Sequence, residues 1–383
     1  MWRTWPRAPI PIWAKAGAVA AVAWPYWAWL YRVCASLHYN DFGKFYYSVL
    51  AWREGRSLYS LNPASFVPGL PEPLTNLNPP HAMLAVWPFT FLETDVAYVV
   101  WMCVNGAGLL YAIAGVCRVT GWRPTLWQLF VLLAGAPTAT WIVTGQLTGV
   151  LAVPLLLAWR AWREGRQPRA GVWLGLAISV KPFLVLLVLW MALRRNWAGV
   201  WTAAATAAAM FICGAVVFGL NAHGDWLDSM RAVSWAGLAM NASWLGILTR
   251  AFSVTPYYVP LAIVPALIVP LWLAGVGLVA AMLVRTSRDQ SDDCGWAALT
   301  LGALLAAPLG WTYYFWWVLS GLPRLLSSPI AGGLLLVPLP MVALTPVVHN
   351  SPWLSVTLGS AYGWALVWAY AAEVRARRTA ATS

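Results

Sequence analysis

Charged residues are scarce in this sequence of 383 residues, of which 9% are charged and 61% are hydrophobic. Soluble domains carry about 25% charged residues, so a soluble globular protein of this size would lack the polar surface that it needs. Regular alternation of polar and apolar residues is also missing, which excludes the strands of a membrane barrel. Instead, the apolar runs reach about 20 residues, the length of a transmembrane helix. The composition therefore predicts an all-α integral membrane protein.

Motifs for soluble catalysis and for metal binding are absent as well. The five cysteines have no paired spacing and predict neither a disulfide framework nor a metal site. The sequence contains no Walker loop, dinucleotide fingerprint, zinc-protease motif or serine nucleophile elbow. It also leaves no room for the soluble α/β domain that a cytoplasmic nucleotide-sugar site requires. We therefore expect no cofactor, although the sequence is compatible with a divalent metal.

The net charge of +12 arises from 24 Lys and Arg residues against 12 Asp and Glu residues. In a soluble protein this excess would suggest nucleic-acid binding. In a membrane protein it is explained by the concentration of Lys and Arg in cytoplasmic loops. The clearest such loop is 160–169, which holds four arginines and one glutamate. We therefore expect membrane lipids, and no nucleic acid, as partners.

Residues 1–383 are predicted to form a single polytopic membrane domain with about twelve transmembrane helices and both termini in the cytoplasm. The basic N-terminus precedes an apolar run that is long for a cleaved signal peptide and is interpreted as an uncleaved first helix, with cleavage at Ala18-Val19-Ala20 as the alternative. Two long segments, 38–95 and 221–259, are assigned to the external side. The predicted spans are 16–37, 96–117, 127–143, 147–159, two half-length helices that meet at 181–182, 197–220, 260–284, a hairpin over 296–322, 329–348 and 353–370.

Two interruptions of this pattern are informative. The first external segment contains two amphipathic stretches, 42–52 and 80–92, which are predicted to lie as helices in the membrane interface. The second interruption is Lys181–Pro182, within the stretch between two basic loops. Proline breaks a helix at such a point, and interrupted helices mark ligand sites in polytopic membrane proteins.

Asp41 is the most suggestive carboxylate on the external side, because aromatic residues rather than charges surround it. A carboxylate at the membrane boundary is costly to desolvate and tends to be functional, which favours the role of a general base. Alternatively, Asp41 caps the following helix, since Asp is a favoured N-cap residue. The local sequence leaves both roles open.

Lys181 lies inside an apolar stretch, where an ammonium group is costly unless an anion meets it. A phosphate group is the natural anion at this depth. The alternative is snorkelling, in which the long side chain reaches the headgroups. The half-length helices are too short to bring Lys181 to the outer surface, which favours the phosphate site.

Three further residues are weaker candidates. Arg250 suits a bidentate contact with phosphate, but its local sequence favours an ordinary interfacial arginine. Gln146, beside a glycine at a hairpin tip, either binds a sugar hydroxyl or satisfies backbone groups. His81, after two prolines, either binds phosphate, carries a proton or is a satisfied interfacial residue.

An ordered set of motifs between residues 38 and 324 resembles glycosyltransferase family 87, which belongs to the GT-C superfamily of polyprenyl-phosphate-sugar-dependent enzymes. The motifs are Tyr39-Asn40-Asp41-Phe42, Tyr46-Tyr47, Glu54-Gly55-Arg56-Ser57-Leu58-Tyr59, Asn78-Pro79-Pro80, Gly145-Gln146-Leu147, Ala170-Gly171-Val172 to Lys181-Pro182, Arg194-Arg195-Asn196-Trp197, Asn241 to Arg250, and Pro308 to Tyr314. In the last motif, Tyr313 and Tyr314 stand where the family pattern has two histidines.

The resemblance implies a GT-C-like helical bundle and an inverting transferase in a bacterial inner membrane, with its active site facing the periplasm. Its donor would be a polyprenyl-phosphate sugar, most simply mannose, and its acceptor a lipid or glycan hydroxyl. Asp41 would act as the general base, and Lys181 and Arg250 would bind the donor phosphate. The remaining residues expected to contact substrate are His81, Gln146, Asn241, Tyr313 and Tyr314.

Two other functions are consistent with parts of the pattern. A lipid or sugar transporter or flippase would explain the broken helix, but it predicts repeat symmetry and charges on both faces. A polysaccharide polymerase or ligase of GT-C architecture predicts a large external loop with paired arginines. Because the polar features gather on one face and such a loop is not evident, the sequence favours the transferase.

Overall fold

The computed structural model describes residues 11–68, 70, 72–288, 292–327 and 350–380. These residues form α-helices and short 3₁₀-helices joined by loops, and among them only two isolated β-bridges occur in place of strands. The all-α prediction is therefore confirmed. The predicted span 329–348, His349 and the basic residues Arg3 and Arg7 lie outside the described residues.

The first half of the chain folds into α1 to α8, with short 3₁₀-helices in the loop before α3 and at the junction after α7. The bounds are α1 (Ile12–Ser36), α2 (Asn40–Arg53), η1 (Pro63–Ser65), η2 (Pro80–Ala85), η3 (Trp87–Phe91), α3 (Thr94–Thr120), α4 (Leu126–Ala134), α5 (Ala136–Thr144), α6 (Thr148–Arg163), α7 (Gln167–Val180), η4 (Pro182–Leu184) and α8 (Val185–Leu193).

The second half of the chain continues with α9 to α14 and closes with α17 and α18. The bounds are α9 (Trp197–Phe218), α10 (Asn221–Arg231), α11 (Trp244–Phe252), η5 (Pro265–Leu267), α12 (Ile268–Ser287), α13 (Asp292–Ala306), η6 (Thr312–Trp317), η7 (Leu319–Gly321), α14 (Leu322–Ser327), α17 (Pro352–Val356), η8 (Leu358–Ser360) and α18 (Ala361–Ala380).

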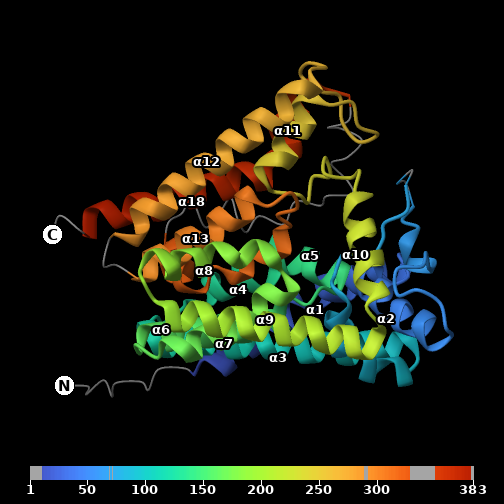
Figure 1. Cartoon of the computed structure of the whole chain (residues 1–383), viewed down its shortest axis with the longest axis horizontal. Helices are drawn as coiled ribbons and strands as arrows, with labels where there is room; N and C mark the ends of the chain where they lie inside the picture. Colours follow the sequence, from blue (N-terminus) through green and yellow to red (C-terminus); the bar gives the residue numbers. More distant parts are fainter. Residues whose placement is uncertain (1–10, 69, 71, 289–291, 328–349, 381–383) are drawn as a thin grey trace, which may run out of the picture.

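The helices form two layers that α8 joins (Figure 1). One layer contains α1, α3, α6, α7 and α9, in which α6 packs between α3 and α7, and α7 packs along α9. The other layer contains α11, α12, α13 and α18, in which α13 packs against both α12 and α18. Because α8 contacts α9 on one side and α12 and α13 on the other, it links the two layers.

The basic loops that the sequence assigns to the cytoplasm gather at one end of the bundle. There, Lys15 Nζ donates to the Pro124 carbonyl oxygen over 3.0 Å, and Arg163 Nη1 lies 3.3 Å from Asp293 Oδ2. The start of α1 and the end of α18 lie at this end, whereas α2 and α10 lie at the opposite end (Figure 1). The predicted topology places these loops on one side of the membrane, and their location in the cytoplasm stays a prediction.

Four helical segments among the described residues are long and apolar enough to cross a membrane. They are Thr94–Thr120, Leu126–Thr144, Trp197–Phe218 and Pro265–Ser287, and each overlaps a predicted span. The predicted break is also confirmed, since α7 ends at Val180 and α8 begins at Val185. The count of about twelve spans and the interfacial position of α2, η2 and η3 stay predictions.

Two predicted elements are not continuous helices: the second half of the hairpin over 296–322 consists of η6 and η7, and the span 353–370 is divided. The helix α17 ends at Val356, and α18 begins at Ala361 after the short η8. The break is stabilised by Ser360, whose hydroxyl donates to the Ser355 carbonyl oxygen over 3.1 Å and accepts from Arg250 Nε over 2.8 Å. A partner from a distant helix therefore stabilises a break that hydropathy does not reveal.

The crossing of α3 and α6 depends on a buried asparagine and a glycine. Asn105 of α3 is fully buried, and its Oδ1 accepts from the backbone N–H groups of Gly149 and Val150 over 3.0 and 3.2 Å. These N–H groups lie in the first turn of α6, where no partner exists within the helix. The backbones approach so closely that position 149 has no space for a side chain.

We predict that Gly149→Ala destabilises the protein by about 1–3 kcal/mol, the usual cost of overpacking. A Cβ atom there would lie 1.9 Å from the Asn105 carbonyl oxygen, so α3 and α6 would have to separate. Thermal unfolding in detergent measures the effect. Gly106→Ala is the matched control, because the nearest atom to its Cβ would be 4.0 Å away. Equal melting temperatures for the two variants would contradict this prediction.

Candidate functional site

Asp41 lies in the first turn of α2, directly after a sharp reversal of the chain. The reversal uses three consecutive left-handed residues, His38 (φ 49°), Tyr39 (φ 62°) and Asn40 (φ 45°), a conformation that is costly for residues other than glycine. Tyr39 occupies the N-cap position of α2. The alternative in which Asp41 caps the helix is therefore wrong, and its carboxylate is free for other contacts near the positive end of the helix dipole.

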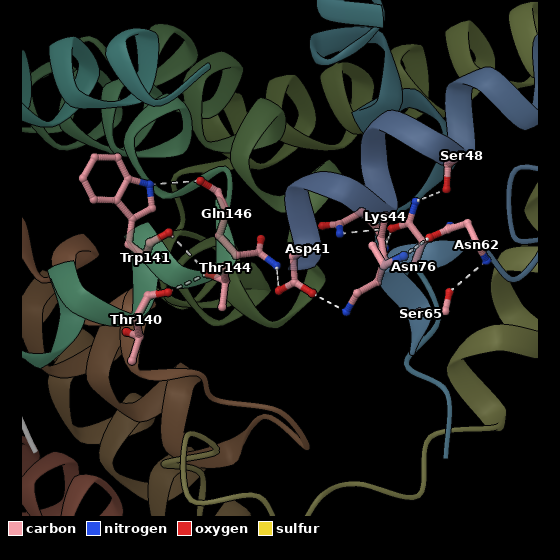
Figure 2. A network of polar contacts seen from close by, with 12 residues as sticks. Asp41, Lys44, Ser48, Asn62, Ser65, Asn76, Thr140, Trp141, Thr144 and Gln146 are labelled. Carbon is pink, nitrogen blue, oxygen red and sulfur yellow. Dashed lines mark hydrogen bonds and ion pairs between the residues drawn. The ribbon is translucent and has the colours of Figure 1, made fainter. Parts of the chain in front are cut away.

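The Asp41 carboxylate is held between two side chains from different parts of the chain (Figure 2). Lys44, one turn along α2, has its Nζ 2.5 Å from Asp41 Oδ1. Gln146 donates from Nε2 to Asp41 Oδ2 over 2.6 Å. The side chain of Lys44 is 3% exposed and that of Asp41 is 19% exposed. The carboxylate thus has a fixed orientation and one accessible side.

Gln146 reaches Asp41 because the α5–α6 turn is pressed against α2. Gly145 has a φ of 64°, and a Cβ atom there would lie 2.6 Å from the Phe42 Cβ atom, so glycine is required for both reasons. Trp101 Nε1 donates to the Gly145 carbonyl oxygen over 2.7 Å, and Trp141 Nε1 donates to that of Gln146 over 3.1 Å. The turn is held by its backbone, which leaves the Gln146 side chain for Asp41.

Lys181 lies at the break between α7 and η4 and points into the protein. Its side chain is buried, and Nζ donates to Asn78 Oδ1 over 2.7 Å. The same Nζ lies 5.1 Å from the centre of the Tyr314 ring, within the range of a cation–π interaction. These contacts are internal, so Lys181 does not snorkel toward the headgroups.

A chain of amide groups connects Lys181 back to α2. Asn78 donates through its backbone N–H to Asn76 Oδ1 over 3.0 Å. Asn76 in turn donates from Nδ2 to the hydroxyl of Ser48 in α2 over 3.1 Å (Figure 2). Because Asp41 and Lys44 lie on the same helix, the loop between η1 and η2 fixes the position of Lys181 relative to the carboxylate.

Tyr313 and Tyr314 form the aromatic side of this cluster. Their rings are 4.6 Å apart in an edge arrangement, and the Tyr314 ring stacks on Trp317 at 4.3 Å. The Asp41 carboxylate lies within electrostatic range of Lys181 and of both tyrosines. We call Asp41, Lys44, Gln146, Lys181 and Tyr314 the Asp41 cluster. It combines a partly exposed carboxylate, able to accept a proton, with a buried ammonium group, able to attract an anion.

His81 supports the break at Lys181 from the side. Its Nε2 is 3.0 Å from the carbonyl oxygen of Ser179, one of the groups left without a helical partner where α7 ends. A carbonyl oxygen can only accept, so Nε2 carries the proton in this contact. Burial lowers the pKa of His81 to about 4. At neutral pH the imidazole is therefore uncharged, and Nδ1 is a buried acceptor without a partner among the described residues.

Arg250 is not brought into the Asp41 cluster by any contact among the described residues. It is fully buried in α11, where Nη1 donates to the carbonyl oxygens of Leu238 and Asn241 over 2.8 and 3.1 Å. Its Nε donates to Ser360, and Nη2 is buried without a partner in the described part of the chain. The guanidinium group therefore holds the loop before α11 in place.

Asn241 joins this loop to the segment that leads to Tyr313. Its Nδ2 donates to the carbonyl oxygens of Ala236 and Pro308 over 2.9 and 3.0 Å. Its Oδ1 accepts from the backbone N–H groups of Ser243 and Gly310 over 3.1 and 2.9 Å. All donors and acceptors of the amide are used, so its contacts are those of a structural residue that orients the tyrosines.

Lys44 and Asn78 were not selected as site residues from the sequence. Lys44 follows Asp41 by three residues, and this spacing places two side chains on one face of a helix. The helix predicted for 42–52 therefore indicates this contact if it begins one residue earlier, at Asp41. Asn78 belongs to the Asn78-Pro79-Pro80 motif, but its contact with Lys181 joins residues 103 positions apart, which no local pattern reveals.

The positive charge beside Asp41 is supplied by the ammonium groups of Lys44 and Lys181. Among the described residues, no three His, Cys, Asp or Glu side chains come together in a group that could hold a metal ion. The Asp41 cluster itself contains a single carboxylate.

Comparison with known proteins gives one family model and two relatives, and all three are glycosyltransferases. The model of glycosyltransferase family 87 matches residues 76–310, a segment that includes Gln146, Lys181 and Arg250 and begins after Asp41. A polyprenol-phosphate-mannose-dependent alpha-(1-2)-phosphatidylinositol pentamannoside mannosyltransferase of Mycolicibacterium smegmatis is 24% identical over 320 residues, which are 79% of this chain and 73% of that protein. A polyprenol-phosphate-mannose-dependent alpha-(1-2)-phosphatidylinositol mannoside mannosyltransferase of the same organism is 26% identical over 334 residues, 79% of this chain and 72% of that protein.

We predict that Arg250→Met lowers stability by about 3 kcal/mol or more, because it leaves several buried carbonyl groups without a donor. Arg231→Met is the matched control, since the Arg231 side chain is 76% exposed and its ion pair with Asp228 is of a kind worth about 0–1 kcal/mol. Thermal unfolding of both purified variants measures the difference. A wild-type melting temperature for Arg250→Met would show that the loop before α11 does not depend on the guanidinium group.

Proposed function

The chain belongs to glycosyltransferase family 87, and from this premise we propose that it transfers mannose from a polyprenyl-phosphate-mannose donor to a hydroxyl group of a lipid or glycan acceptor. The donor is supported by both relatives, which are named for their dependence on polyprenol-phosphate-mannose. The same names specify phosphatidylinositol mannosides as acceptors, which supports a lipid-linked acceptor here.

The observation that carries the proposal is a partly exposed carboxylate on α2 together with a buried lysine at a helix break, which Asn78 and Asn76 connect to Ser48 of the same helix. Glycosyl transfer from a phosphate-linked sugar requires a base for the acceptor and a cation for the leaving phosphate. The Asp41 carboxylate suits the role of the base, and the Lys181 ammonium group suits the role of the cation. Beyond their polar partners, the rings of Tyr313 and Tyr314 form an aromatic side of the cluster, as suits a donor whose lipid tail stays in the bilayer.

In the proposed reaction, Asp41 accepts the proton of the acceptor hydroxyl group. At the same time, the oxygen of that hydroxyl group attacks the anomeric carbon of the donor sugar. The bond from that carbon to the phosphate oxygen breaks, and the electron pair leaves with the polyprenyl phosphate. Attack from the face opposite the leaving group inverts the anomeric configuration. Lys181 stabilises the charge that develops on the phosphate, and stabilisation aimed at developing charge is often the largest contribution to catalysis.

The neighbours of these two residues have positioning roles. Lys44 and Gln146 bind one carboxylate oxygen each and keep the accessible side of Asp41 toward the acceptor. Tyr314 and Asn78 hold the Lys181 ammonium group. We assign Tyr313 and the buried Oε1 of Gln146 to contacts with the sugar, because Oε1 has no partner among the described residues. Arg250 supports the loop before α11, and Asn241 joins that loop to the segment before Tyr313.

We further propose that the enzyme lies in a bacterial inner membrane with the Asp41 cluster facing the periplasm. The gathering of basic loops at the opposite end of the bundle supports this orientation, since such loops concentrate in the cytoplasm. The polyprenyl donor would then enter from the outer leaflet.

Asp41→Asn and Asp41→Ala are expected to lower transfer at least about 100-fold, the usual lower limit for loss of a general base. Transfer of radiolabelled mannose from polyprenyl-phosphate-mannose into lipid, in membranes that contain each variant, measures the effect. Glu54→Gln is the control, because it removes a carboxylate whose side chain is 60% exposed just after α2. Wild-type turnover by both Asp41 variants would refute the mechanism, and lipid movement without a glycosyl product would favour a transporter.

Lys181→Ala is expected to reduce kcat/KM for the donor about 10- to 100-fold, which corresponds to losing a charged hydrogen bond of about 1.5–3 kcal/mol. Asn78→Ala should reduce it less, because the ammonium group stays but loses its positioning partner. Arg56→Ala removes an exposed positive charge near α2 and should leave kcat/KM unchanged. If Lys181→Ala folds and uses the donor normally, the phosphate role of Lys181 is excluded.

A further inference from the structure

A polar cavity lies at the end of the bundle opposite the Asp41 cluster, between the α6–α7 and α8–α9 connections. Its volume is about 360 Å³, and it is lined by Trp162, Arg163, Gly165, Gln167, Arg194 and Asn196. Among these described residues, two are arginines and none carries a carboxylate. The cavity lies far from the Asp41 cluster, so an inference about this cavity does not depend on the proposed transferase function.

Two helix N-termini meet at this cavity. α7 begins at Gln167 and α9 begins directly after Asn196, and both residues line the cavity. The two helices start side by side, since Thr202 Oγ1 of α9 donates to the Pro168 carbonyl oxygen of α7 over 2.9 Å. The start of α7 has no side-chain cap. Gln167 N already donates to the Gly165 carbonyl oxygen, Pro168 has no N–H group, and the Asn196 side chain caps α9, so the helix ends contribute chiefly through the positive ends of their two dipoles, which favour an anion here.

Buried donors in the cavity wall lack partners, which points to a ligand independently of the helix ends. Asn196 is 3% exposed, and its Nδ2 has no hydrogen-bond partner among the described residues. Its Oδ1 is fixed by accepting from Gly199 N over 3.0 Å, so the amide cannot turn around. Trp162 is 9% exposed, and its Nε1 is likewise without a partner there. An unpaired buried donor costs about 1–3 kcal/mol, a cost that an oxyanion would remove.

The arginines of the wall are held in place for such a ligand. The Arg194 guanidinium carbon lies 4.9 Å from the centre of the Trp190 ring and 5.7 Å from that of Trp162. Arg163 contacts Asp293 at the edge of the site. Stacked arginines keep a fixed geometry and present planar donors that match phosphate oxygens.

The first turns of α9 show where this cavity lies relative to a membrane. Trp197 is 54% exposed and Trp201 is 68% exposed, at the start of a helix that can cross a membrane. Exposed tryptophans at a helix end mark the level of the headgroups. The cavity, next to Asn196, is therefore at the depth where lipid phosphates occur, and its size suits a small polar group.

We propose that this cavity binds a phosphate group, carried by an anionic lipid headgroup or by free phosphate, through Asn196, Arg194, Trp162 and the N-termini of α7 and α9. Acyl chains of a bound lipid would lie along the exposed face of α9. The site is separate from the Asp41 cluster and constitutes a second phosphate site at the other end of the bundle.

The test compares binding of phosphatidylglycerol to the full-length protein and three variants by native mass spectrometry in detergent. Asn196→Asp keeps the helix cap, since Asp caps as well as Asn, but replaces the free donor by a negative charge. Arg194→Gln removes a cavity charge, and Arg195→Gln is the matched control, because Arg195 is exposed and does not line the cavity. Diacylglycerol with the same acyl chains controls for binding without phosphate.

We expect Asn196→Asp and Arg194→Gln to bind phosphatidylglycerol roughly tenfold more weakly than the wild type, the factor for one charged hydrogen bond, and Arg195→Gln to bind it normally. Competition by inorganic phosphate would assign the site to phosphate from any source. If the two cavity variants weaken lipid binding but inorganic phosphate does not compete, the site would be assigned to the lipid headgroup. Equal phosphatidylglycerol binding by all four proteins, or equal binding of diacylglycerol, would overturn the proposal.

Discussion

Polar groups inside this apolar bundle must find partners within the protein, because neither hydrocarbon nor packed apolar side chains supply them. Asn105 meets this requirement where α3 crosses α6, and Asn241 meets it where the loop before α11 joins the segment before Tyr313. Arg250 does so with backbone carbonyl groups. Each of these side chains ties together segments that are distant in the sequence. The few buried polar residues therefore determine how the helices and loops are joined.

The polar atoms that do not meet this requirement are equally informative. Among the described residues, buried atoms without partners include Gln146 Oε1 and His81 Nδ1 around the Asp41 cluster, and Trp162 Nε1 and Asn196 Nδ2 at the opposite cavity. Leaving such atoms unpaired is unfavourable. These four atoms lie at the two ends of the bundle, with Lys181 and Arg194 nearby, where a polar ligand would supply the missing partners.

Features of the fold that depend on local sequence could be predicted. Long apolar runs gave the positions of α3, α9 and α12, and Pro182 gave the break between α7 and α8, because hydropathy and the missing proline N–H act within one segment. Asp41 and Lys181 could be selected because a charge in an apolar neighbourhood is unusual wherever the chain goes. The order of the family motifs then connected these two residues.

Features that depend on tertiary contacts could not be predicted. The left-handed residues from His38 to Asn40 are stabilised by the packing around them, for example by the contact of Tyr39 with Asp95 over 2.5 Å. The break before α18 depends on Arg250. Arg250 itself was expected at the donor phosphate, since an arginine fork suits phosphate and backbone carbonyls alike. Only the positions of the neighbouring groups in the structure show whether Arg250 binds a phosphate group or backbone carbonyl groups.

The segment from α7 to α9 connects both ends of the molecule. α7 starts with Gln167 at the cavity and ends next to Lys181, and α9 starts directly after Asn196 and packs against His81 through Gly214. In each place the backbone has groups that the helix itself cannot pair. A bundle with so few charged side chains has its chemistry at such helix ends, because there the main chain adds donors, acceptors and dipoles to the few polar residues. The break at Lys181 creates an additional pair of ends next to Asp41, where the proposed reaction requires them.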